Sequence, residues 1–387
     1  MRSRRVENDP NSSSREVSRR GMLGLGSSAP AAPRPSVSNA GGSYQLLKAV
    51  RPAMGGWFEV RLPHFLPGAA DLATRALDAI EVLESRLTVY RDDSEVAYLN
   101  SNAARGPVEV APDLFELLQT AIAIHRETAG AYDVTTGALS TAWGFTRGPK
   151  RVPSDRERLD ALARTGSNKL LLDPERKTVA FDIDGLSINL GSIGKGHAVD
   201  VATRVVRDYW LPTAALIHGG RSSLFALGSP PDILSSAWDL SVHHPLDPAA
   251  TLGTLHLRDR AMGTSGATFQ SFDEAGRLYG HIIDPRTGEP PTSGPLSVSV
   301  LAPTAAEADA LSTAFFLIGP DRAAQILARR RDMGALFVLP AESAGGPLRV
   351  ATIGLTARDY TPPSRSAAIE VVSLDRSPGS RDRSNPR

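Results

Sequence analysis

Leu186-Ser187-Ile188-Asn189-Leu190-Gly191-Ser192-Ile193-Gly194-Lys195-Gly196 runs from a short apolar segment into a glycine-rich loop. Two short strands are predicted over 179–190, around the Asp184-Gly185 pair. A helix is predicted from about Lys195 to Tyr209, because apolar residues recur on one side at helical spacing. The stretch therefore predicts a strand, a glycine loop and a helix in succession, in a protein of mixed α and β structure.

Further elements follow on either side of this stretch. Apolar stripes predict helices over 71–87 and from Pro112 onward. Thr304 followed by Glu307 is a capping-box signature, so another helix should begin there. Weak alternation predicts a strand over 54–62, and the remaining strands are expected at 213–218, 253–258, 277–283 and 296–302.

Composition excludes several classes of protein. The 387 residues are 41% hydrophobic, which is enough for a sizeable core. A net charge of +1 provides no long-range field to attract nucleic acid. No segment reaches the roughly 18 apolar residues that a stable membrane span needs. The sequence has no cysteine, which excludes disulfides and thiolate metal sites.

The two ends differ from the rest of the chain. Residues 1–44 and 361–387 are rich in Ser, Pro and Arg, and we expect both to be disordered around a folded domain at 45–360. Ser18-Arg19-Arg20-Gly21-Met22-Leu23 is similar to a twin-arginine signal, although the apolar stretch after it is short. We expect an exported, periplasmic protein, with a plain disordered tail on a cytoplasmic protein as the alternative.

Three glycine-rich segments follow predicted strands. They are Gly191–Gly196, which contains Lys195, Gly219-Gly220-Arg221-Ser222-Ser223, and Gly263-Thr264-Ser265-Gly266. Glycine lets a backbone approach a bulky anion, and the amides at a helix start favour phosphate oxygens. Each segment alone is explained equally well as an ordinary turn. Three in one chain favour a shared ligand edge.

Asp309 and Thr313 lie four residues apart in the helix predicted from Thr304. This spacing places both oxygens on one helix face, and we take Asp309 as an exposed site carboxylate. Hard oxygen ligands suit Mg²⁺, which completes its shell with phosphates and water. The alternative is that Asp309 is simply a carboxylate stabilised by the helix dipole in the first turns of the helix, and that Thr313 is a core residue.

Two further segments contain candidate groups. His281 precedes an Asp284-Pro285 turn, where it could act as a general base or be an ordinary polar residue. Gly130–Gly137 and the aromatic Trp143-Gly144-Phe145 offer hydroxyls and ring surface for a flat ligand, or simply core packing.

Taken in order, these segments resemble the ApbE-like FAD:protein FMN transferase family over about 45–357. The family's Phe-Asp-x-Thr-x-Gly-x-Leu segment corresponds to Tyr132–Leu139, and its Asp-Leu-Gly-Gly-Ile-Ala-Lys-Gly loop to Asn189–Gly196. This chain thus carries Asn189, Ser192 and Gly194 where the family has Asp, Gly and Ala. The other matching blocks are Met54-Gly55-Gly56, Leu87–Tyr90 with Asp93-Ser94-Glu95 and Asn100, His281–Gly288 and Ala308–Ala314.

The resemblance implies an α+β fold, with an ApbE-like (T-fold-like) core of mixed sheet and helices and a smaller inserted lobe. It implies that FAD is the substrate, that Mg²⁺ is the metal cofactor, and that FMN is transferred to a threonine of an acceptor flavoprotein with release of AMP. It assigns the metal to Asp309, Thr313 and the main-chain carbonyl of Gly194, and catalysis to His281. The cofactor-binding residues that it implies are Met54, Tyr90, Asp133, Thr135, Lys195, Gly219, Gly220, Ser265 and His281.

Two other functions remain open on the sequence. If water replaces the threonine, the same site is an FAD pyrophosphatase that releases FMN and AMP. Because Asn189 replaces an acid and Arg221 stands where the family often has Asp or Asn, a flavin-binding protein without turnover is the third possibility.

Overall fold

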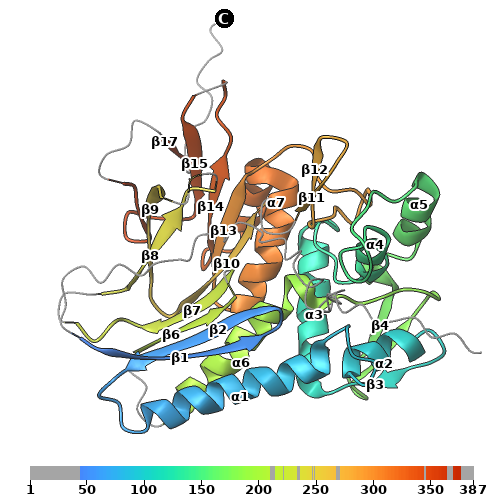
Figure 1. Ribbon diagram of the computed structural model, residues 1–387, viewed down its shortest axis with the longest axis horizontal. Helices are drawn as coiled ribbons and strands as arrows, with labels where there is room; N and C mark the ends of the chain where they lie inside the picture. The colour runs from blue at the N-terminus through green and yellow to red at the C-terminus, as the bar shows by residue number, and fades with distance from the viewer. Residues whose placement is uncertain are drawn as a thin grey trace, which may run out of the picture. The chain divides into compact units, whose positions relative to one another are not determined.

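A nine-stranded mixed sheet is the centre of the computed structural model (Figure 1). Every neighbouring pair in it is antiparallel except the last, β15 with β17. The structure describes residues 44–209, 214–220, 222–232, 236–245, 247, 249–266, 271–343, 346–363 and 369–375. In sheet order the strands are β1 (Leu46–Ala53), β2 (Gly56–Pro63), β6 (Ala214–Gly219), β7 (Ser223–Gly228), β10 (Arg260–Gly266), β13 (Ser297–Ala302), β14 (Gly334–Leu339), β15 (Leu348–Ile353) and β17 (Ile369–Ser373).

Three long helices pack on one face of this sheet: α1 (Ala69–Leu87), α6 (Gly194–Arg207) and α7 (Ala305–Leu327). Apolar periodicity predicted α1 and α6, and the capping-box signature at Thr304 predicted α7; the apolar side of each is buried in the main core. Thr304 is the N-cap of α7, as expected, and its hydroxyl accepts from the Glu307 amide. Gly319, with a φ of 74°, interrupts α7 just before Pro320.

A second, smaller sheet covers the opposite face. It consists of β8 (Trp238–His243), β9 (Thr251–Leu257) and β16 (Tyr360–Thr361). Trp238 and the leucines of β9 are buried against leucines of the central sheet, which gives the sheet a second apolar core. The central sheet is therefore buried on both faces.

The inserted lobe lies between α1 and α6 in the sequence (Figure 1). Its core continues into that of the main sheet, and the α+β fold with an inserted lobe is confirmed. The lobe contains α2 (Glu95–Asn102), β3 (Val108–Glu109), α3 (Pro112–Glu127), α4 (Gly137–Ala142), α5 (Asp155–Ala163), η1 (Ser167–Lys169), β4 (Leu170–Asp173), β5 (Thr178–Phe181) and η2 (Leu190–Ser192). A separate hairpin, β11 (Ser271–Glu274) with β12 (Arg277–Gly280), packs its aromatic side chains on the α4 segment.

Several sequence expectations are wrong in detail. The strand predicted over 54–62 begins only at Gly56, since Met54 and Gly55 form the turn of the β1–β2 hairpin. The second strand of 179–190 is reduced to a single parallel bridge between Ser187 and Thr136. Next to it, the Ile188 amide donates to Asn100 Oδ1 (2.8 Å) and Asn100 Nδ2 donates to the Ile188 carbonyl (3.0 Å).

Two further differences concern Gly263–Gly266 and the C-terminal region. Gly263–Gly266 is the end of β10 rather than a loop, because it pairs with β7 and β13. Within the expected tail at 361–387, β17 extends the central sheet. The N-terminal region, including the arginine pair, lies outside the described residues apart from Tyr44. In the part of the chain that the structure describes, no helix is long and apolar enough to cross a membrane.

Candidate flavin and metal site

Two glycines let α7 lie very close to its neighbours. A Cβ atom on Gly196, in the first turn of α6, would lie 2.1 Å from the carbonyl oxygen of Ala305. A Cβ atom on Gly263, in β10, would lie 2.5 Å from the amide nitrogen of Asp309. Both contacts are too short for any side chain, so only glycine allows the start of α7 to touch α6 and β10 together. Asp309 is placed at this junction.

The Asp309 carboxylate is buried, not exposed as the sequence argument assumed, with a relative exposure of 6%. Its Oδ2 accepts from the Gly196 amide at 2.7 Å, and the Ser223 hydroxyl lies 2.6 and 2.7 Å from its two oxygens. Burial raises the pKa of Asp309 to about 6, although Lys195, Ser223 and the Gly196 amide all lower it. A buried carboxylate whose charge is only partly compensated is well suited to a cation.

Hydroxyl groups surround the next turn of α7. The Ser265 hydroxyl of β10 lies 3.2 Å from the Thr313 hydroxyl and 2.8 Å from that of Ser312. The Thr313 hydroxyl donates to the Asp309 carbonyl at 3.3 Å. Thr313 is thus held on the same side of α7 as Asp309, as their spacing predicted.

Gly194 is the first residue of α6, two positions before the amide that binds Asp309. A Cβ atom on Gly194 would meet only Leu190 Cβ, at 3.5 Å, so the alanine of the family pattern would fit here. The available donors are a carboxylate, hydroxyls and main-chain groups; no cluster of three His, Cys, Asp or Glu side chains exists among the described residues. This set fits Mg²⁺, which needs few protein ligands when phosphates and water supply the rest.

The predicted glycine edge exists at one end of the sheet. Ser223 of β7 pairs with Gly263 of β10, which brings the second and third glycine segments together. A Cβ atom on Gly219 would lie 3.3 Å from the Lys195 carbonyl oxygen, and one on Gly220 would lie 3.5 Å from Lys195 Cδ. The β6–β7 turn therefore lies against the start of α6.

Met54 reaches the same end of the sheet from the β1–β2 turn. Its φ of 49° and that of Gly55, 70°, match a two-residue hairpin turn in which both residues have positive φ. The Met54 amide donates to Glu84 Oε1 of α1 at 2.6 Å. A Cβ atom on Gly56 would lie 3.3 Å from Gly220 Cα, so this turn adjoins the glycine edge.

Contacts link Tyr90 with the surroundings of His281. Tyr90 follows α1 and is 63% exposed. Beside it, the Val89 carbonyl accepts from Arg147 Nη2 at 3.0 Å. Two residues from Arg147, the ring of Phe145 meets the His281 ring edge-on, with 6.5 Å between centroids. The segment that contains Tyr90 thus contacts the segment with Phe145 and Arg147, which in turn contacts His281.

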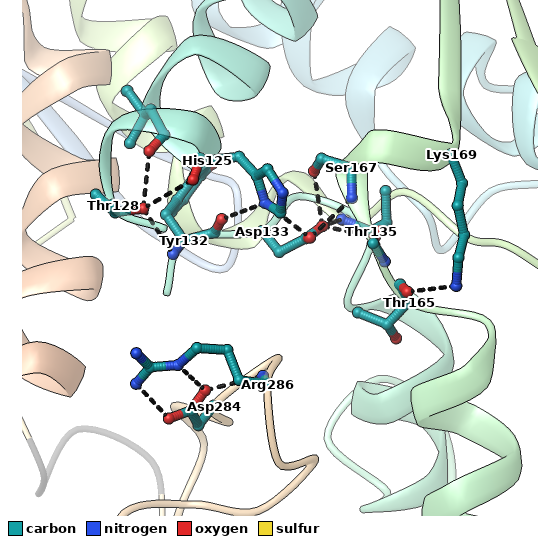
Figure 2. A network of polar contacts seen from close by, with 12 residues as sticks. His125, Thr128, Tyr132, Asp133, Thr135, Thr165, Ser167, Lys169, Asp284 and Arg286 are labelled. Atoms are coloured by element: carbon teal, nitrogen blue, oxygen red, sulfur yellow. Dashed lines mark hydrogen bonds and ion pairs between the residues drawn. The ribbon is translucent and has the colours of Figure 1, made fainter. Parts of the chain in front are cut away.

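Asp133 and Thr135 form a buried network, shown in Figure 2. Asp133 Oδ1 accepts from the Thr135 amide and hydroxyl and from the Ser167 hydroxyl, at 2.6–2.7 Å, and His125 lies 3.0 Å from Oδ2. Burial alone would raise the pKa of Asp133, but the hydrogen bonds from His125, Thr135 and Ser167 outweigh it and hold that pKa below its usual range. These side chains bind one another and support the loop, and direct contact with FAD stays a prediction.

Sequence reasoning missed Asp200, which joins α6 to α7. The Asp200 carboxylate accepts from the amides of Ala305 and Ala306 at 2.8 and 2.9 Å. These amides belong to the first turn of α7, where no intrahelical partner exists. The sequence predicted the helix that contains Asp200, but no local pattern indicates that Asp200 binds the start of a helix about 100 residues later in the chain.

The fold and the site define an α+β protein in which a buried carboxylate and several hydroxyls meet at a glycine-lined end of the central sheet. The model of the ApbE family matches residues 54–337. The chain belongs to the ApbE family.

Relatives in sequence and in structure agree. The chain is 32% identical to the FAD:protein FMN transferase of Treponema pallidum, covering 66% of this chain and 74% of the relative. It is 31% identical to the FAD:protein FMN transferase of Vibrio cholerae, over 70% of this chain and 81% of the relative. The solved flavin transferase ApbE from Vibrio cholerae superposes with a TM-score of 0.71 at 26% identity, covering 80% and 97%. The ApbE protein from Thermotoga maritima gives 0.70 at 28% identity, covering 79% and 96%.

Proposed function

We propose that this protein is an Mg²⁺-dependent FAD:protein FMN transferase that attaches FMN to a threonine of an acceptor flavoprotein. The observation that carries the proposal is the buried Asp309 carboxylate at the junction of α6, α7 and β10, beside Lys195 and next to Thr313. The membership of this chain in the ApbE family and its similarity to relatives named FAD:protein FMN transferase support this activity.

Asp309, Thr313 and the Gly194 carbonyl would hold Mg²⁺, with diphosphate oxygens and water as its other ligands. The bound ion would supply positive charge that stabilises the diphosphate as it gains negative charge in the transition state. Lys195 contributes a second positive charge at the same helix start. The glycine edge at Gly219 and Gly220 lets the ligand approach the main chain.

In the reaction, the acceptor threonine oxygen forms a bond to the FMN-side phosphorus of FAD. The bond between that phosphorus and the bridging oxygen breaks, and AMP leaves with the electron pair. We assign His281 as the base that removes the hydroxyl proton, since an imidazole can accept a proton near neutral pH. Met54 and Tyr90, at the β1–β2 turn and after α1, are proposed to lie along the cofactor, with Ser265 behind the metal ligands.

The test is transfer in a defined mixture. The protein, FAD, Mg²⁺ and a flavoprotein fragment encoded beside its gene are incubated, and an FMN adduct on threonine is sought by mass spectrometry. Asp309→Asn should abolish the adduct, and the exposed Asp71→Asn should not. Rapid AMP release without the fragment, and no adduct with it, would instead identify an FAD pyrophosphatase. Intact FAD in every mixture would refute both activities.

A further inference from the structure

A carboxylate of α6 binds the start of α7 from outside that helix. The Asp200 side chain is half-buried, and its two oxygens accept from the Ala305 and Ala306 amides at 2.8 and 2.9 Å. These amides have no partner within α7, and a carboxylate that leaves water needs hydrogen bonds of its own. Each group therefore satisfies the other, and the two bonds join helices that are far apart in the sequence.

The candidate metal ligands come from the same two helices. Gly194 begins α6, less than two turns before Asp200, and Asp309 lies about one turn after Ala305 in α7. A helix rises about 1.5 Å per residue, so the Asp200 bonds lie about 9 Å from Gly194 along α6 and about 6 Å from Asp309 along α7. A shift of either helix at Asp200 would therefore move the ligands that it carries.

Only one other hydrogen bond joins α6 to α7 in the part of the chain that the structure describes. It runs from the Gly196 amide to Asp309 Oδ2, which is an oxygen of the candidate metal ligand itself. That carboxylate would have to serve both the amide and the metal. Asp200 instead binds two amides that are not metal ligands, so its bonds are the part of the junction that is the same with and without the metal.

We propose that Asp200 is a positioning residue for the metal site. It holds the start of α7 against α6, so that the Gly194 carbonyl and the Asp309 carboxylate keep the separation that Mg²⁺ requires. Mg²⁺ demands near-ideal octahedral geometry with ligands at about 2.0–2.1 Å, so a small change in that separation weakens binding. Asp200 acts through the two helices and does not touch the ion. The identity of the metal site rests on the proposed function.

The experiment measures the affinity for Mg²⁺ as well as turnover. Mg²⁺ is titrated by calorimetry into the wild type and Asp200→Ala at pH 8, because burial raises the pKa of Asp200 to about 7 although the two amides lower it. Loss of the outer contacts that orient metal ligands typically weakens binding by about 10–100-fold, and we expect about tenfold here. In the transfer assay, the Mg²⁺ concentration that gives half the maximal rate should rise by the same factor, and saturating Mg²⁺ should restore most of the rate.

Two variants in the first turn of α7 separate positioning from other effects. Thr304→Ala removes the N-cap bond to the Glu307 amide, which lies within α7 and does not reach α6. It should lower the midpoint of urea unfolding, as Asp200→Ala should, but leave the Mg²⁺ affinity unchanged. Glu307→Gln removes one negative charge from the same turn and should also leave that affinity unchanged.

The possible results distinguish the role of Asp200 from the metal assignment. Wild-type Mg²⁺ affinity in Asp200→Ala, or an equal loss of affinity in either Thr304→Ala or Glu307→Gln, would overturn the positioning role and leave the metal site standing. If the wild type itself binds no Mg²⁺, the metal assignment of the proposed function fails, and the role of Asp200 fails with it. Asp200→Asn, which keeps one acceptor oxygen, is measured in parallel in case Asp200→Ala does not fold, and the same criteria apply to it.

Discussion

Replacing Gly196 by alanine should separate α6 from α7 and lower the rate of flavin transfer about 100-fold. The new Cβ atom would lie 2.1 Å from the Ala305 carbonyl oxygen, whereas ordinary contact begins at 3.4 Å. One helix would have to retreat by roughly 1.3 Å, the difference between these distances. Overpacking of this kind costs about 1–3 kcal/mol, and weakening the Gly196 bond to the Asp309 carboxylate costs about 1.5–3 kcal/mol more. We expect the free energy of unfolding to fall by about 3 kcal/mol or more.

The loss of activity should exceed the loss of folded protein. A displacement of about 1 Å at a reacting centre can lower a rate about 100-fold, and here it would move Asp309 away from the start of α6. The assay is the initial rate of FMN transfer at saturating acceptor, with urea unfolding measured on the same samples. Gly194→Ala is the matched control: its Cβ atom would meet only Leu190 Cβ at 3.5 Å, so it should keep near-wild-type rate and stability. A Gly196→Ala protein as active and stable as Gly194→Ala would refute the close-packing argument.

Three other predictions follow from charge and export. In EDTA, Asp309→Asn should be more stable than the wild type at pH 8 by about 1–3 kcal/mol. The pKa of Asp309 rises from 3.8 to about 6 on folding, so the wild-type protein loses stability as the pH rises through that window. Urea unfolding at pH 4 should show that the difference vanishes. Asp133→Asn should destabilise the protein by about 2 kcal/mol or more at pH 7, since the Thr135 and Ser167 amides that donate to the carboxylate would then face a neutral side-chain amide. The advantage of the wild type should shrink in acid, because the pKa of Asp133 is lowered on folding. Unfolding curves across the acid range test this. Replacing Arg19 and Arg20 together by lysine should leave the protein in the cytoplasmic fraction if the pair is an export signal, and an unchanged distribution on cell fractionation would contradict that expectation.

Local pattern determined the long helices and the placement of Asp309 and Thr313 on one helix face. The apolar stripe of 71–87 and the cap at Thr304 each depend on residues within a few positions of one another. Both helices could therefore be predicted from the sequence alone. The i, i+4 relation of Asp309 and Thr313 is local in the same sense. The order of the motifs also indicated the ApbE family, which the family match confirms.

Tertiary structure decided burial, partners and the edges of the sheet. The amide that binds Asp309 is 113 residues away and its serine partner 86 residues away, and no local pattern encodes such contacts. The sequence likewise could not reveal that Asp133 is tied to Ser167, or that β17 joins β15. These features depend on which surfaces meet when separate segments pack, and only glycines such as Gly196, where a Cβ atom has no room, record that packing in the sequence.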